Sequence, residues 1–335
     1  MYSLRGRKME RRRKAAVGVI CILVGVLLFL LFYVFVRKYD ASQQVQDRGS
    51  MSEGFGQQRE NVIGGKSYKL KWDLETFLLI GTDRMTREQT GYRSGGQADT
   101  LILLVADHQE KVIRMLQLDR DTMAQVTVLG VLGNYAGLRE MQICLAHAYG
   151  ATPEENNQHT VEAVSRLLDN IPIDGYLSVD LVDIPAVNRM LGGVTVTLED
   201  DFSQFDPQMV PGATLKLTDQ QAELFLHSRM MIGDGTNSSR MRRHRMYLDE
   251  VIRMIREKLS QNASYGNHLL NQLSEISVSS VKTGKLINVL NRIYNYTISP
   301  METLDGEYRV GQDGFKEFHA DQTSIDNWVI KSICE

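Results

Sequence analysis

Four short polar segments stand next to apolar runs in this sequence, and their side chains are carboxylates and guanidinium groups. The segments are Gly81-Thr82-Asp83, Gln97-Ala98-Asp99-Thr100, Asp119-Arg120-Asp121-Thr122, and the group Arg229, Arg240 and Arg243. Carboxylates and arginines at the ends of strands and helices are the groups that hold a metal ion and a phosphorylated ligand. The pattern therefore indicates phosphate chemistry.

Asp83, Asp99 and Asp121 each flank a predicted strand. Taken alone, each is equally well explained as an ordinary turn or strand-end residue. Several carboxylates close together repel one another unless a cation neutralises them, and oxygen ligands with a phosphate partner suit Mg²⁺ or Mn²⁺. The sequence predicts a divalent metal here, and a network of Arg–Asp ion pairs remains the alternative.

A predicted helix that begins near Arg240 carries the second argument. Its apolar stripe places Arg240, Arg243 and Tyr247 on one flank, and Arg242 and Arg245 on the opposite, solvated flank. Cations at a helix N-terminus oppose the helix dipole at a cost of about 0.3–1 kcal/mol each. A bound polyanion reverses that balance, so the cluster predicts a phosphate or pyrophosphate site, with surface salt bridges as the alternative.

Alternating predicted strands and helices must position these groups. Apolar runs predict buried strands over 77–80, 101–105 and 112–118, the last two as a hairpin, and further strands over 173–181 and 194–198. Helices are expected over 138–149, from Pro153 onward, before Gly192-Gly193, and from Thr218 through Arg229. The predicted fold class is α/β, an αβα sandwich with a central mixed β-sheet.

The N-terminal region predicts a membrane anchor. Residues 15–36 are an uninterrupted apolar run without charge, long enough to cross a bilayer and longer than the core of a cleaved signal peptide. Seven basic residues precede the run, so the N-terminus is expected in the cytoplasm and the rest outside, as a single-pass protein of the cell membrane.

The expected organisation is a basic cytoplasmic tail (1–14), a transmembrane helix (15–36), an extracellular tether (37–66), a catalytic domain (67–260) and a C-terminal extension of uncertain fold (261–335). The chain has 38 Lys and Arg and 41 Asp and Glu; without the nine basic residues and one acidic residue of the first 38 positions, the remainder has a net charge of −11. An acidic body argues against nucleic acid as a partner. Outside the predicted span the chain has only Cys144 and Cys334, and a disulfide between them is left open.

The polar segments, in this order behind a single span, resemble the LytR-CpsA-Psr (LCP) family of cell-envelope phosphotransferases. The resemblance covers roughly residues 75–259 and includes Leu118-Asp119-Arg120-Asp121-Thr122, Ile171-Pro172-Ile173-Asp174-Gly175-Tyr176 and Leu191-Gly192-Gly193-Val194-Thr195-Val196. It implies transfer of a glycopolymer phosphate from an undecaprenyl-pyrophosphate carrier to a cell-wall acceptor such as peptidoglycan, outside the membrane and with Mg²⁺ or Mn²⁺. It also implies an apolar slot for the polyprenyl tail.

The resemblance assigns roles to positions of this chain. It implies Asp83 and Asp99 as metal ligands, with Asp99, Arg120 and Asp121 as the catalytic group. The residues expected around the pyrophosphate are Arg120, Arg229, Arg240, Arg243, His227 and His244. Asp121 would orient Arg120 or help to accept the acceptor proton.

Three positions depart from the family pattern, where Gln97, His227 and His244 replace a usual Arg, Arg and Gln. The site therefore has less fixed positive charge. A non-catalytic protein that binds polyprenyl pyrophosphate or wall polymer and a polyprenyl-pyrophosphate pyrophosphatase are the alternative functions. A transcriptional attenuator, an older label for this family, is disfavoured because the acidic domain is expected across the membrane from DNA.

Overall fold

The computed structural model describes residues 60–84, 95–130 and 133–335. The predicted cytoplasmic tail, the predicted span over 15–36 and most of the predicted tether lie outside these residues. Among the residues that the structure describes, no helix combines the length and the apolar composition needed to cross a membrane.

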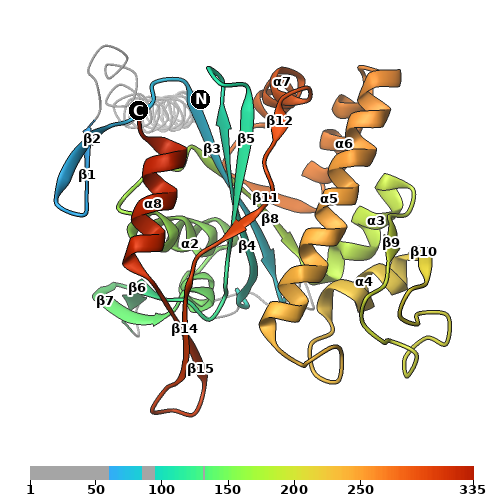
Figure 1. The fold of residues 1–335 in the computed structure, drawn as a ribbon, viewed down its shortest axis with the longest axis horizontal. Helices are drawn as coiled ribbons and strands as arrows, with labels where there is room; N and C mark the ends of the chain where they lie inside the picture. Colours follow the sequence, from blue (N-terminus) through green and yellow to red (C-terminus); the bar gives the residue numbers. More distant parts are fainter. Residues whose placement is uncertain (1–59, 85–94, 131–132) are drawn as a thin grey trace, which may run out of the picture. The chain divides into compact units, whose positions relative to one another are not determined.

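A seven-stranded sheet forms the centre of the domain (Figure 1). Its strands are β11 (Ser277–Ser279), β8 (Gly175–Asp180), β3 (Leu74–Thr82), β4 (Ala98–Asp107) and β5 (Val112–Leu118), followed by β12 (Thr297–Ile298) and β13 (Glu302–Thr303), which both pair with β5. β3, β4 and β5 are antiparallel neighbours, whereas β8 runs parallel to β3, and β12 and β13 run parallel to β5. The prediction of a mixed sheet with a β4–β5 hairpin is confirmed.

Helices cover both faces of this sheet. Side chains alternate along β4, so that Leu101 faces α2 (Pro153–Leu167) and α8 (Gln322–Ile333), while Ile102 faces α5 (Asn237–Gln261). Figure 1 shows α2 and α8 on one side of the strands and α5 on the other. Since both faces are buried, the near-continuous apolarity of the strands is explained.

A smaller apolar cluster lies beyond the sheet. It is formed by α3 (Ile184–Leu191), β9 (Thr195–Thr197), β10 (Thr214–Lys216) and α4 (Asp219–His227), and it packs around Phe202 and Phe225 against α5. Gly192, at a φ of 85°, ends α3 as predicted, and Thr218 with Gln221 forms the predicted capping box of α4. The strand expected over 194–198 pairs with β10 and is not part of the central sheet.

Two helix predictions need correction. The segment 138–149 is mostly β7 (Tyr135–Gln142), which pairs with β6 (Met123–Leu129), and only Ile143–Ala148 is helical, as a 3₁₀ helix. Cross-strand pairing with β6 outweighs the local helical pattern. Helix α4 ends at His227, so Arg229 lies in the following loop and not on the helix.

The C-terminal residues are part of the same compact unit, which spans Glu60–Glu335. Besides three strands of the central sheet, they contain α6 (Tyr265–Ser274), α7 (Thr283–Ile293), β14 (Gly306–Val310), β15 (Lys316–Ala320) and α8. Trp328 and Val329 of α8 belong to the main core. The boundary expected at residue 260 therefore does not separate two domains, and the unit begins with a hairpin, β1 (Glu60–Ile63) and β2 (Lys66–Lys69), before the expected residue 67.

Candidate functional site

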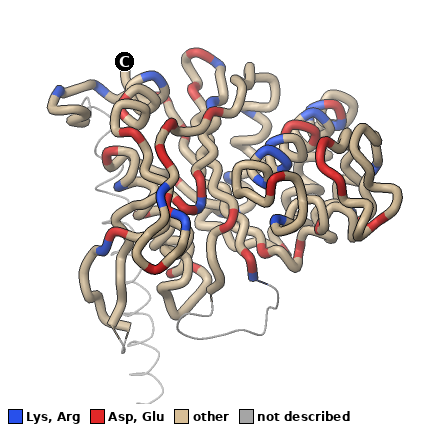
Figure 2. Tube along the Cα trace, turned by 60° about the horizontal axis from the view of Figure 1, so that its bottom comes forward, with Lys and Arg blue, Asp and Glu red and all other residues tan. Residues whose placement is uncertain are grey.

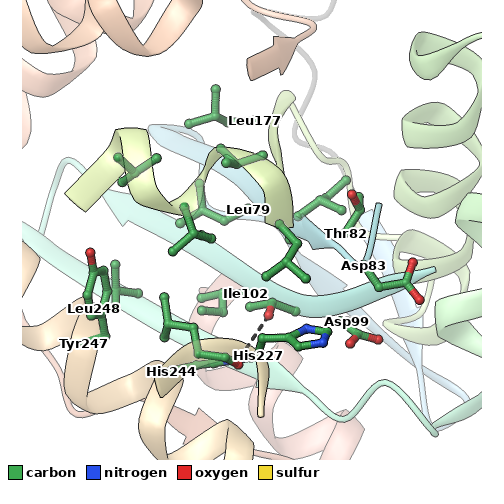
Figure 3. Close-up of a pocket in the computed structure, with 18 of the residues that line it drawn as sticks. Leu79, Thr82, Asp83, Asp99, Ile102, Leu177, His227, His244, Tyr247 and Leu248 are labelled. Atoms are coloured by element: carbon green, nitrogen blue, oxygen red, sulfur yellow. Dashed lines mark hydrogen bonds between the residues drawn. The ribbon is translucent and has the colours of Figure 1, made fainter. Parts of the chain in front are cut away.

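An apolar cavity of about 270 Å³ lies between the central sheet and α5, with polar groups at one end. Its apolar wall is formed from β3, β4, β8, α3 and α5, and includes Leu79, Ile102, Leu177, Val187 and Leu248. Figure 3 shows Asp83 and Asp99 together at one end, with His227 beside Asp99. Of the predicted site residues, the cavity wall contains Asp83, Asp99, His227, Arg240 and His244.

A β-bulge places Asp99 in this wall. In the β3–β4 ladder Gly81 pairs with Thr100 and Thr82 pairs with Ala98, so Asp99 is the additional, unpaired residue of β4. Consecutive residues of a regular strand point to opposite faces of a sheet. Asp99 and Thr100 instead both line the cavity, because the bulge redirects the carboxylate.

The Asp99 carboxylate lies between two arginines. Arg240 Nη1 donates to Asp99 Oδ2 at 2.5 Å, and Arg120 Nη1 forms an ion pair with Oδ1. Burial lowers the pKa of Arg240 to about 10, and repulsion from Arg120 and Arg229 adds to the effect. Two guanidinium groups share this one carboxylate, and guanidinium groups suit an anionic ligand.

Arg120 has further contacts that fix its plane. Its Nη2 donates to Gln97 Oε1 and, at 3.3 Å, to Cys144 Sγ, and its Nε is 3.5 Å from Asp121 Oδ1. Gln97, which stands where the family pattern has an arginine, thus serves as an acceptor for Arg120. Cys144 and Cys334 are both free and buried, so they do not form a disulfide.

Asp121 is a buried carboxyl next to a second one. Burial and the charge of Asp119 raise the pKa of Asp121, while Arg120, Arg229 and Arg240 act in the opposite direction. Its neighbour Asp119 accepts the backbone N–H of Asp121 at 2.8 Å. A carboxylate with a raised pKa beside arginines is suited to accept a proton at neutral pH.

Arg243, which the sequence analysis expected near the pyrophosphate, does not line the cavity. The residue is 1% exposed, and all of its donor nitrogens have acceptors within the protein. Nη1 binds Asp200 Oδ2 at 2.7 Å, Nε donates to Phe225 O at 2.8 Å, and Nη2 donates to Ser228 O. Arg243 therefore ties α5 to the end of α4, and thereby fixes the loop that carries Arg229.

Among the predicted site arginines, Arg229 has the fewest side-chain hydrogen bonds and ion pairs within the described residues. Within the described part of the chain, its half-buried guanidinium makes no hydrogen bond or ion pair, yet its charge influences both Asp121 and Arg240. His227, two residues earlier, is exposed at the cavity wall. Both residues are placed where a ligand at the polar end of the cavity could reach them.

His244 lies in the wall but is neutral and already bonded. Its Nε2 lies 2.9 Å from Leu226 O and its Nδ1 lies 3.0 Å from Thr100 Oγ1. Since a carbonyl oxygen only accepts, Nε2 carries the proton and Nδ1 accepts from the hydroxyl. Burial, reinforced by the charge of Arg240, lowers the pKa of His244 to about 3. His244 thus positions Thr100 and does not offer a donor to a ligand.

The predicted metal ligands lie at the same end of the cavity (Figure 3). Asp83 Oδ1 accepts the backbone N–H of Gln97 at 2.6 Å, and both oxygens of Asp99 are ion-paired. Across the described residues, no group of three or more His, Cys, Asp and Glu side chains is arranged to hold a metal ion. Two carboxylates fit Mg²⁺ only when substrate phosphates supply further oxygens, a common arrangement for this ion.

Sequence reasoning assigned no role to three residues that support the site: Asp119, which it named only as part of a polar segment, and Asn237 and Tyr308, which it missed. Asn237 Nδ2 donates to Asp119 Oδ1 at 2.9 Å, Asn237 Oδ1 accepts from Arg240 Nη2 at 2.9 Å, and Tyr308 donates its hydroxyl to Asp119 Oδ2. The position of Asn237 three residues before Arg240 was a local signal. Tyr308 has no such signal, because it approaches from a distant part of the chain.

Fold and site together define an α/β domain in which Asp99, ion-paired to Arg120 and Arg240, lies at the polar end of an apolar cavity. A family model described as the LytR_cpsA_psr family matches residues 33–331, and the chain belongs to this family. The polyisoprenyl-teichoic acid–peptidoglycan teichoic acid transferase TagU of Halalkalibacterium halodurans is 30% identical over 178 residues, 53% of this chain and 52% of that protein. TagV of Bacillus subtilis, a transferase of the same description, is 23% identical over 330 residues, 96% of this chain and 77% of that protein. The match to TagU thus spans about half the length of that relative.

Solved structures share the fold. The protein gbs0355 of Streptococcus agalactiae superposes with a TM-score of 0.63 at 21% identity, covering 78% of this chain and 88% of that one. A structure of TagT bound to LI-WTA gives a TM-score of 0.57 at 19% identity, covering 78% of this chain and 91% of that one.

Proposed function

We propose that this protein is a membrane-anchored transferase that moves a glycopolymer phosphate from a polyprenyl-pyrophosphate carrier, such as undecaprenyl pyrophosphate, to a cell-wall acceptor such as peptidoglycan. The observation that carries the proposal is that Asp99 and Arg240 lie in the wall of an otherwise apolar cavity and that Arg120 is ion-paired to Asp99. The arginines suit a pyrophosphate, and the cavity suits the adjoining part of an apolar tail. The relatives named as teichoic acid transferases support the same activity.

The distribution of charge on the domain fits an anion site confined to the arginine cluster and does not fit an extended anion-binding surface. Figure 2 shows acidic and basic residues interspersed along the described chain. Nucleic acid, which is bound through extended basic surface, does not fit such a distribution. Membrane attachment is part of the proposal and is supported by the apolar sequence of residues 15–36.

In the proposed transfer, an acceptor hydroxyl oxygen forms a bond to the phosphorus that carries the glycopolymer. The bond from this phosphorus to the bridging oxygen breaks, and polyprenyl monophosphate leaves. Asp121 takes the proton of the hydroxyl, for which its raised pKa suits it. Arg120, Arg240 and Arg229 neutralise charge on the phosphates, since phosphoryl transfer depends mainly on positioning and electrostatic stabilisation.

Asp83 and Asp99 would hold Mg²⁺ or Mn²⁺ together with the phosphates. The ion would supply additional charge neutralisation at the leaving oxygens. Asp99 would then share its oxygens between the metal and the two arginines, which places metal binding after ligand binding.

The direct test is transfer by the full-length protein in detergent, with a lipid-linked wall polymer, peptidoglycan and Mg²⁺. Polymer should become covalently attached to peptidoglycan, and polyprenyl monophosphate should appear in equal amount. Phosphate release without an acceptor would instead identify a pyrophosphatase.

A non-catalytic carrier of the same ligand is the second candidate. It is favoured by Gln97 and His227, which stand where the family pattern has arginines and leave the site with fewer cations. The two functions separate in cells that carry Asp121→Asn, which removes the proton acceptor. If the protein is a transferase, polymer attachment to the wall is lost while ligand binding is kept, whereas if it is a carrier, both are unchanged.

A further inference from the structure

A chain of hydrogen bonds leaves the site from Arg240 and ends on a hairpin near the C-terminus. Arg240 Nη2 donates to Asn237 Oδ1 at 2.9 Å, and Asn237 Nδ2 donates to Asp119 Oδ1 at 2.9 Å. The other oxygen of Asp119 accepts the hydroxyl of Tyr308. The guanidinium that holds Asp99 is thereby connected to β14.

The hairpin formed by β14 and β15 is attached to the loop that carries Asp121. Phe318 N donates to Asp121 O at 2.8 Å, and Gln142 Nε2 donates to Lys316 O at 2.7 Å. The ring of Tyr308 packs on that of Phe318, with centroids 5.0 Å apart. Figure 1 shows the hairpin extending from the end of the sheet where β6 and β7 also lie. The position of Tyr308 is therefore fixed relative to the site loop.

Asp119 connects these two parts because it has three donors. Besides Asn237 and Tyr308, the backbone N–H of Asp121 donates to it at 2.8 Å, and the residue is only 7% exposed. A buried carboxylate that lost one donor would not recover it from water and would shift toward another partner. Such a shift would move the Asn237 amide and, with it, the acceptor of Arg240.

We propose that Tyr308 and Asn237 are positioning residues of the transfer reaction, which act through Asp119 to hold Arg240 in the orientation that meets both Asp99 and a pyrophosphate. The restraint is needed because Arg120 and Arg229 repel Arg240. The β14–β15 hairpin is thus a working part of the site. The inference rests on the proposed function for the identity of the ligand and the reaction.

The test uses the full-length protein with Tyr308→Phe, which removes the hydroxyl and keeps the ring on Phe318. We expect kcat/KM for the lipid-linked polymer to fall about tenfold, through a lower kcat and a higher KM, because Arg240 meets the pyrophosphate in both binding and transfer. KM for peptidoglycan should change less than twofold. The thermal midpoint should stay close to that of the wild type. Tyr294→Phe, at a 41% exposed tyrosine on α7, is the matched control and should transfer at the wild-type rate.

A double-mutant cycle distinguishes positioning from a general structural effect. Lys at position 240 has no second nitrogen with which to meet Asn237, so Arg240→Lys removes the group through which Tyr308 acts. Tyr308→Phe should therefore cause no further loss in the Arg240→Lys background. Multiplicative losses would contradict the inference. Asn237→Ala should resemble Tyr308→Phe in the wild-type background and also add nothing to Arg240→Lys.

The wild-type protein separates the two possible failures. If the wild type transfers polymer and Tyr308→Phe retains the full rate, the positioning role is refuted while the proposed function stands. If the wild type does not transfer, the proposed function fails. Binding of geranylgeranyl pyrophosphate then decides the inference: about tenfold weaker binding by Tyr308→Phe supports it, and equal binding overturns it.

Discussion

Asp99 and Arg240 form an ion pair of 2.5 Å at the wall of the apolar cavity, with Arg120 on the other carboxylate oxygen. Because Asp99 neutralises part of the arginine charge, it holds the two guanidinium groups together before any ligand binds.

Asp99→Asn should separate ligand binding from transfer. Without the carboxylate, two guanidinium groups face the ligand with their full charge, so metal-free binding of geranylgeranyl pyrophosphate should be equal or tighter. Transfer should fall by about 100-fold or more, because the two arginines lose the group that orients them. Calorimetry gives the first quantity and polymer attachment the second. Parallel loss of both would indicate that Asp99 acts only in folding.

Arg243→Met should destabilise the fold. It leaves Asp200 buried with a single remaining arginine partner, and breaking a buried ion pair costs about 3–5 kcal/mol. Urea unfolding measures the change. The control is Arg253→Met on the same helix, where a 62% exposed side chain forms surface ion pairs worth about 0–1 kcal/mol. Similar stability of the two variants would contradict the structural role of Arg243.

Arg229→Ala should weaken ligand binding and leave stability nearly unchanged, in contrast to Arg243→Met. Because the guanidinium has no partner among the described residues, the free energy of unfolding should change by less than about 0.5 kcal/mol. Affinity for a polyprenyl pyrophosphate should drop about 10- to 100-fold, the usual range for a charged hydrogen bond. Arg292→Ala, at an exposed pair with Asp73, should leave affinity unchanged.

His244 should make the protein less stable in mild acid. Its pKa falls from 6.5 to about 3 in the folded state, so between these values the unfolded chain binds one more proton. This contribution is absent above about pH 6.5 and lowers the free energy of unfolding by about 2 kcal/mol at pH 5. His244→Gln should therefore show a smaller stability loss between pH 7 and pH 5 than the wild type. Parallel pH profiles of the two proteins would refute the assignment.

Divalent metal should bind together with the ligand and not before it. Mg²⁺ added to the protein alone should give little heat in calorimetry, since both oxygens of Asp99 are ion-paired. With geranylgeranyl pyrophosphate present, saturable binding should appear, and Asp83→Asn should weaken it. Chelation should abolish transfer, and added Mg²⁺ should restore it. Transfer that is unaffected by chelation would remove the metal from the proposal.

Local signals in the sequence predicted the central strands and most helix ends. The antiparallel β4–β5 hairpin, the Thr152 cap of α2 and the Gly192 end of α3 all depend on residues a few positions apart. Features set by distant partners were not predicted. Residues 135–142 form β7 because they pair with β6. The strands β11, β12 and β13 and the helix α8 have weak patterns in the sequence, yet they complete the central sheet and the main core.

The site shows the same division. Helical spacing correctly placed Arg240 and Arg243 on one side of α5, but it could not distinguish an arginine at the cavity from one that holds Phe225 O and Asp200. That difference depends on what packs against each turn of the helix. The bulge at Asp99 was also hidden, because it exists only in the register with β3.

At the bulge in β4, the number of residues in the strand decides whether the carboxylate reaches the cavity. Between Ala98 and Leu101, β4 has one residue more than β3 can pair with. This extra residue turns the acidic side chain of Asp99 toward the cavity. A protein of this kind could keep every functional residue type and still lose its anion site through a single deletion here. Alignments that score only identity at Asp99 would therefore overlook the number of residues around it, which is equally a condition for the chemistry.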